Sequence, residues 1–156
     1  MQQMVPVTLD ACYESSRVFT FLDRTNLYLA AEVRGLWIDL TQLSHLIETR
    51  FPLSQLWTTR LYQWTNTITN KFHGKVANCG YELISLPNKD ADAAIATDCL
   101  DIFYNNQKET NIFILGSHDG DYYRMLNLLK AKGTQVILLG FKDAFSSLIT
   151  NCCEII

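Results

Sequence analysis

Aspartates gather in three short segments of this chain, and each segment directly follows an apolar run. Asp23 ends the run RVFTFLD, Asp90 and Asp92 follow YELISL, and Asp119 and Asp121 follow NIFIL. Carboxylates that lie close together resist ionising together, and a bound cation relieves their repulsion. Ligand sets made only of oxygen favour magnesium or manganese over zinc. If the fold brings the segments together, they could hold a metal that activates water for attack at phosphorus.

These aspartates also have an ordinary structural explanation. Aspartate is a common helix N-cap, and Asp90, Asp119 and Asp121 all lie where helices are expected to begin. Asp23 is harder to explain in this way, because it directly follows an apolar run and no helix obviously begins there. Chance convergence of all three segments is less expected than a single cap, so the set carries more weight than any one member.

Apolar runs alternate with amphipathic segments along the chain. We predict strands at 17–23, 55–62, 81–86, 111–115 and 135–139. Helical spacing of apolar residues predicts helices at 37–50, 66–78, 90–105, 121–132 and 144–150, and 152–156 is a last strand or a packed end. This alternation is typical of an α/β fold with a parallel sheet covered on both faces. Ligands of such sheets bind beyond the carboxyl ends of the strands, where the aspartates lie.

The composition is that of a folded protein, with 48% apolar and 19% charged residues among 156. This length suits one domain, placed at 1–156 with 1–16 as a loose lead-in. No apolar run reaches the roughly 20 residues that cross a bilayer, and the N-terminus lacks the pattern of a signal peptide. Five scattered cysteines without CxxC spacing indicate free thiols in a reducing compartment, so we expect a cytoplasmic protein. A net charge of −3 argues against wholesale coating of nucleic acid but is compatible with a local basic groove.

Three motifs in the same order resemble the NYN domain family. Asp23–Asn26 resembles its Asp-x-x-Asn opening, and Lys89–Asp98 resembles its Lys-x-x-Asp helix start with a second aspartate six residues on. Gly116–Tyr122 resembles its Ser-Gly-Asp-x-Asp-Phe segment. The motifs and the strand that follows them cover about residues 17–140. The bacterial members nearest to this pattern are the LabA-like proteins.

The resemblance implies a three-layer α/β/α PIN-like (Rossmann-like) fold, with a central parallel sheet in the strand order 3-2-1-4-5. It also implies an endoribonuclease that depends on Mg²⁺ or Mn²⁺. Asp23, Asp92 and Asp119 match the principal acidic positions, which are expected to be catalytic and to bind the metal together with Asp121. Further positions are expected to contact substrate or to support the site: Asn26, Lys89, Asp98, Ser117 and His118.

Two of these positions raise questions of geometry. Asp98 lies six residues beyond Asp92, which is about 120° around a helix, so both side chains cannot point straight at one ion. We therefore expect Asp98 to support the metal ligands without binding the ion itself, or to face the substrate. His118 stands where the family usually has glycine, and its side chain could shift Asp119, contact substrate or do neither.

Two functions from different classes follow. The first is a metal-dependent ribonuclease that acts on RNA, expected to be single-stranded, and the leucine-rich helix faces permit a homodimer. The second is a non-catalytic LabA-like regulator that binds RNA or a protein partner. A platform of Trp57, Tyr62 and Trp64 with Arg60 could stack on RNA bases, although packing at a strand edge is the favoured interpretation. A phospho-acceptor role for Asp23 is weaker, because that pattern needs a second aspartate where Thr25 stands.

Overall fold

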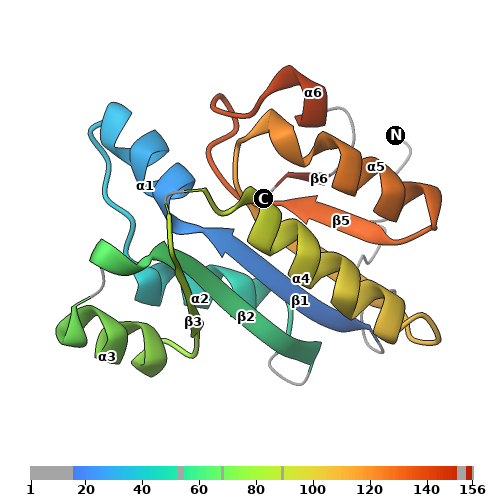
Figure 1. Cartoon of the computed structure of the whole chain (residues 1–156), viewed down its shortest axis with the longest axis horizontal. Helices are drawn as coiled ribbons and strands as arrows, with labels where there is room; N and C mark the ends of the chain where they lie inside the picture. The colour runs from blue at the N-terminus through green and yellow to red at the C-terminus, as the bar shows by residue number, and fades with distance from the viewer. Residues whose placement is uncertain (1–15, 53–54, 68, 89, 151–153, 156) are drawn as a thin grey trace, which may run out of the picture.

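The computed structural model describes residues 16–52, 55–67, 69–88, 90–150 and 154–155, so nearly all of the lead-in expected at 1–16 lies outside the described part. Within these residues, parallel strands form one sheet in the order β3-β2-β1-β4-β5-β6 (Figure 1). The strands are β1 (Arg17–Asp23), β2 (Leu56–Trp64), β3 (Glu82–Leu86), β4 (Asn111–Gly116), β5 (Gln135–Leu138) and β6 (Glu154–Ile155). The predicted order 3-2-1-4-5 is confirmed, and the short strand β6 extends the sheet beyond β5.

The central strand β1 is apolar on both sides because both faces of the sheet are covered. Phe19 and Phe21 belong to one buried cluster, and Val18 and Leu22 belong to the other. On its two edges β1 pairs in parallel with β2 and with β4. Asp23 is the last residue of this strand, so it emerges at the middle of the carboxyl edge.

Helices cover the two faces of the sheet and complete the three predicted layers (Figure 1). The cluster that contains Val18 also contains residues of α1 (Arg24–Val33), α2 (Leu40–Arg50) and α3 (Asn70–Asn78). The cluster that contains Phe19 also contains residues of α4 (Asp92–Asn105), α5 (Tyr123–Ala131) and α6 (Ser147–Thr150). Two 3₁₀ turns, η3 (Thr65–Thr67) and η4 (Gly120–Tyr122), follow β2 and β4. No helix in the described ranges is long and apolar enough to cross a membrane.

The expectation that no helix begins after Asp23 is wrong. Helix α1 starts at Arg24, and Asp23 is its N-cap, since its Oδ1 accepts a hydrogen bond from the Asn26 N–H at 3.2 Å. The helix escaped prediction because apolar residues lie all around it. Its described buried residues are Leu27 and Ala31, whereas other apolar side chains of the same helix are exposed. Helical periodicity is weak in such a segment.

The other helices start two to four residues later than predicted, and for α2 and α3 a capping side chain marks the start. The Asp39 side chain accepts from the backbone of Thr41 and Gln42, so α2 begins at Leu40. Thr69 caps α3 in the same way. Capping satisfies backbone N–H groups that have no partner within the helix, and this fixes the first turn.

Candidate metal centre

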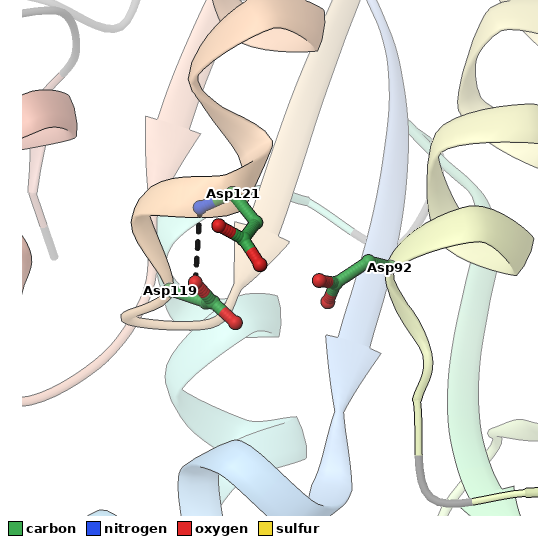
Figure 2. A group of neighbouring side chains, drawn as sticks. All are labelled: Asp92, Asp119 and Asp121. Atoms are coloured by element: carbon green, nitrogen blue, oxygen red, sulfur yellow. Dashed lines mark hydrogen bonds between the residues drawn. The ribbon is translucent and has the colours of Figure 1, made fainter.

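Three carboxylates meet at the carboxyl edge of the sheet. Asp92, Asp119 and Asp121 each offer an oxygen, and these oxygens all lie within 4.8 Å of one another. Asp92 is the first residue of α4, whereas Asp119 and Asp121 come from the turn between β4 and α5. Figure 2 shows the three side chains pointing toward one another across the end of the sheet. We call these three residues the acidic cluster.

Short polar turns hold the acidic cluster in place. The Asp119 Oδ1 accepts from the Asp121 N–H at 2.9 Å, a bond that caps η4 (Figure 2). The Ser117 Oγ accepts from the Asp119 N–H at 3.3 Å. On the other side, the Asp90 Oδ1 accepts from the Asp92 N–H at 2.9 Å. The capping explanation is therefore correct for Asp119, which also contributes to the acidic cluster.

Asp23 lies beside the acidic cluster rather than within it. Its side chain is buried, and its Oδ2 accepts a hydrogen bond from the hydroxyl of Tyr122 at 3.5 Å. Burial raises the pKa of Asp23 to about 6, and the negative charge of Asp119 adds to this rise. The hydrogen bond from Asn26 opposes it. A carboxylate in this position ionises more readily when a cation neutralises its neighbours.

Tyr122 links Asp23 to the acidic cluster, and no role was predicted for its hydroxyl from the sequence. Burial raises the pKa of Asp92 to about 6, with repulsion from Asp119 and Asp90, while a hydrogen bond from Tyr122 opposes the rise. Burial and the adjacent carboxylates raise the pKa of Tyr122 itself, so its hydroxyl stays protonated and donates. The one signal in the sequence is a tyrosine where the motif has phenylalanine.

The residues present fit a hard divalent cation. All the donors are carboxylate oxygens, which suit Mg²⁺ or Mn²⁺. Burial is the main cause of the raised pKa of Asp92, and repulsion from Asp119 and Asp90, which a cation would remove, adds to it. The acidic cluster would supply the ligands of such a cation, and Asp23 lies at its border.

A sequence model of the NYN domain matches residues 17–156. The chain belongs to the NYN domain family. This is a family of PIN-like nucleases, whose members generally act on RNA and depend on divalent metals. The fold is similar to that of a crystallised protein of unknown function from Vibrio parahaemolyticus, with a TM-score of 0.76 and 18% sequence identity over 90% of this chain and 91% of that one. The comparison with curated proteins finds no match.

Two NYN motif positions meet each other beside the acidic cluster. The Asn26 Oδ1 accepts from the His118 N–H at 2.8 Å and lies 2.9 Å from the His118 Nδ1. Asn26 thus joins the start of α1 to the turn after β4. Ser117 is fully buried and supports the backbone of Asp119. Lys89, the basic position of the second NYN motif, lies outside the described residues.

The imidazole of His118, at the position where the NYN motif has glycine, is a buried structural contact. Its Nε2 accepts from the Phe141 N–H at 2.8 Å, so Nδ1 carries the proton and donates to Asn26. The ring packs on Phe141 and Phe145. Burial lowers the pKa of His118, and the charge of Arg34 lowers it further, so the ring is neutral. Apart from the bond to Asn26, its described contacts lie in the segment after β5 rather than in the acidic cluster.

Asp98 of α4 contacts β2, the strand to which all residues of the predicted aromatic platform belong. Asp98 Oδ2 accepts from the hydroxyl of buried Tyr62 at 2.7 Å and lies 3.4 Å from the Arg60 guanidinium. Arg60 also pairs with Glu82 on β3 at 2.9 Å. Trp57, near the start of β2, stacks with the guanidinium of Arg17. These contacts support packing along the sheet as the role of the aromatic residues.

Proposed function

We propose that this NYN domain is a metal-dependent endoribonuclease that hydrolyses RNA phosphodiesters. The observation that carries the proposal is the acidic cluster, in which carboxylate oxygens from two strand ends lie within 4.8 Å of one another. The family match supports it, because NYN nucleases generally use a divalent metal to act on RNA. Free thiols at Cys79 and Cys99 suit a reducing compartment, and we place the protein in the cytoplasm.

The acidic residues divide into metal ligands and a proton acceptor in this mechanism. Asp92, Asp119 and Asp121 would hold Mg²⁺ or Mn²⁺, which supplies charge stabilisation at the phosphoryl oxygens and a lower pKa for bound water. Asp23 has a pKa of about 6, near the pH of the cell, and is suited to accept a proton from the attacking water. Tyr122 donates to Asp23 and keeps that carboxylate at the edge of the acidic cluster.

The test combines calorimetry with cleavage. Purified protein should bind Mn²⁺ with measurable heat and cleave a single-stranded RNA. Asp92→Asn and Asp119→Asn should lose the heat and lower the cleavage rate by a factor of about 100 or more, as expected when electrostatic stabilisation of the transition state is removed. Asp101→Asn is the matched control, because Asp101 is an exposed aspartate of the same helix α4. If wild type and both variants give the same heat and the same rate, the proposal is wrong.

A LabA-like regulator without catalysis is the second candidate, and an exposed apolar surface favours it. Leu29, Val33, Leu36 and Trp37 are all exposed on α1 and the turn after it, with Trp37 88% exposed. Exposed apolar groups of this kind are typical of protein interfaces, including those of a homodimer. A regulator of this class would show no metal heat that depends on Asp92, so the same calorimetry separates the two candidates.

A further inference from the structure

A groove of about 590 Å³ runs between α4 and α5 and starts at the acidic cluster. This volume lies in the range of pockets that hold small organic ligands, about 300–1,000 Å³. Figure 1 shows the two helices on the same face of the sheet, and the groove is lined from both of them. Asp92 and Asp121 belong both to the acidic cluster and to the groove, so the two are continuous.

The lining of the groove combines apolar surface with two groups that recognise nucleotides. Ala96 and Leu100 from α4 face Met125 and Leu128 from α5. Tyr123 and Arg124, the first residues of α5, also line it. Aromatic rings and guanidinium groups both stack on nucleobases, and arginine also pairs with phosphate.

Both of these groups are accessible. The Tyr123 side chain is 41% exposed although it is large and apolar over most of its surface. Arg124 is exposed, and among the described residues no carboxylate pairs with its guanidinium. By contrast, Arg17, Arg34 and Arg60 each pair with a carboxylate. Within the described part of the chain, Arg124 is therefore a cation without a carboxylate partner, placed three residues after Asp121 of the acidic cluster.

We propose that the groove between α4 and α5 holds one unpaired nucleobase of the RNA, next to the phosphate at the acidic cluster. Tyr123 stacks on the base, and Arg124 contacts an adjoining phosphate. This inference rests on the proposed function, because it assumes that the phosphate to be cleaved lies at the acidic cluster. A nucleotide joined to that phosphate reaches the groove directly, since Asp92 and Asp121 line both.

The groove selects single strands by physical exclusion. A base within a duplex is stacked on both faces and paired at its edge, so it cannot enter a groove between two helices. An unstacked base of a single strand can turn outward and exchange its stacking partner for an aromatic side chain. The lining of the groove is largely apolar, and Asn127 is its amide side chain, so we expect preference for single strands with weaker preference for sequence.

The test measures RNA affinity in Ca²⁺ by fluorescence anisotropy, with a labelled 12-nucleotide single strand and its duplex as probes. Tyr123→Ala should weaken binding of the single strand about tenfold, as expected for loss of one base–aromatic stack. Tyr123→Phe keeps the ring and should bind as wild type does. Arg124→Gln should weaken binding. It should also make the binding constant less dependent on salt concentration, by the amount that about one phosphate contact contributes. Lys130→Gln, which alters an exposed cation at the other end of α5, should leave affinity within twofold.

An RNA with one abasic nucleotide localises the effect. Placed at the position next to the cleavage site, the abasic residue should weaken binding to wild type about as much as Tyr123→Ala does, and should weaken that variant no further. Unchanged affinity in Tyr123→Ala and Arg124→Gln would overturn the inference, and so would an abasic scan without effect. Calorimetry with Mn²⁺ separates this failure from failure of the proposed function, because neither variant alters a carboxylate of the acidic cluster.

Discussion

Single carboxylates at the sheet edge have pKa values that folding raises, and this affects the free energy of unfolding. Folding raises the pKa of Asp23 from 3.8 to about 6, mainly through burial. Between these pH values the folded chain binds more protons than the unfolded chain, so stability falls as the pH rises through this window. Above pH 6 the full penalty is present. The metal-free protein therefore holds an unfavourable charge at its candidate site near neutral pH.

Asp23→Asn should remove this penalty and keep an oxygen that can cap α1. In EDTA at pH 7.5 the variant should be more stable than wild type by about 2 kcal/mol. This gain is somewhat smaller than the free energy that corresponds to the whole pKa shift, at about 1.4 kcal/mol per pKa unit. At pH 4 the two proteins should be nearly equal in stability. Urea denaturation at both pH values measures the difference, and the same difference at both would contradict the assignment.

His118 should act on stability rather than on metal affinity. His118→Ala removes the acceptor of the Phe141 N–H and leaves a space between Phe141 and Phe145. We expect a loss of about 2–3 kcal/mol in the free energy of unfolding, with Mn²⁺ affinity changed by less than about threefold. Urea denaturation and calorimetry give the two values. His73→Ala is the control, because it alters an exposed histidine and should leave the free energy of unfolding nearly unchanged. A large loss of metal affinity in His118→Ala would show instead that His118 contributes to the metal site.

At the scale of elements, close contact between β1, β4 and α1 sets the position of Asp23. The pairing of β1 with β4 ends at Leu22 and Gly116, the residues just before Asp23 and Ser117. A Cβ atom on Gly116 would lie 2.5 Å from the Leu22 Cδ2 and 3.2 Å from the Leu27 Cδ1. Only glycine fits there without movement of the side chains that pack α1 against the sheet.

Gly116→Ala should therefore destabilise the protein by about 1–3 kcal/mol, as overpacking does. It should also weaken Mn²⁺ binding, because the displaced strand ends carry Asp23 and Asp119. Gly74→Ala is the control, with an effect of opposite sign. No atom lies within 4 Å of a Cβ placed on Gly74 in α3, so this substitution should stabilise the protein by roughly 0.5–1 kcal/mol. Thermal melting and calorimetry on both variants check the pair, and a neutral Gly116→Ala would show that the contact is loose.

The sequence predicts elements that continuous apolar runs or clear periodicity define, and it fails where the deciding contact is distant. Strands β1 to β5 were predicted, most of them because they are compact apolar runs and β2 because its residue types favour strands. Helix α1 was missed because its exposed Val33 is as apolar as its buried Leu27. The link from Tyr122 to Asp23 joins residues 99 positions apart, and the contact of His118 with Phe141 depends on where the segment after β5 returns. Such contacts have no local pattern.

At the scale of the whole molecule, one edge of the sheet collects charge from distant parts of the chain. The strands are all parallel, so their carboxyl ends meet at the same edge. Segments around Asp23, Asp92 and Asp119 converge there, with raised pKa values for the first two. The stability of the fold and the affinity for a cation are consequently linked.

Mn²⁺ should raise the melting temperature of wild type at pH 7.5 and have much less effect at pH 5. At pH 5 the ligand Asp92, with a pKa of about 6, is mostly protonated, and the metal must displace that proton. A concentration 100 times the dissociation constant corresponds to about 2.7 kcal/mol of stabilisation. Thermal shift measurements at both pH values test this, with Asp92→Asn expected to show no shift. Equal shifts for wild type at the two pH values would argue against binding at these carboxylates.

The double role of two aspartates has a consequence for evolution. Asp23 caps α1 and Asp119 caps η4, so a descendant that abandoned chemistry would still be selected to keep an oxygen at both positions. Asp92 begins α4 without a side-chain cap bond. Genetic drift would therefore erase Asp92 first. Among relatives of this domain, a lineage that has given up cleavage should be recognised by the loss of Asp92, while an aspartate or asparagine at position 23 would reveal only that α1 is still capped.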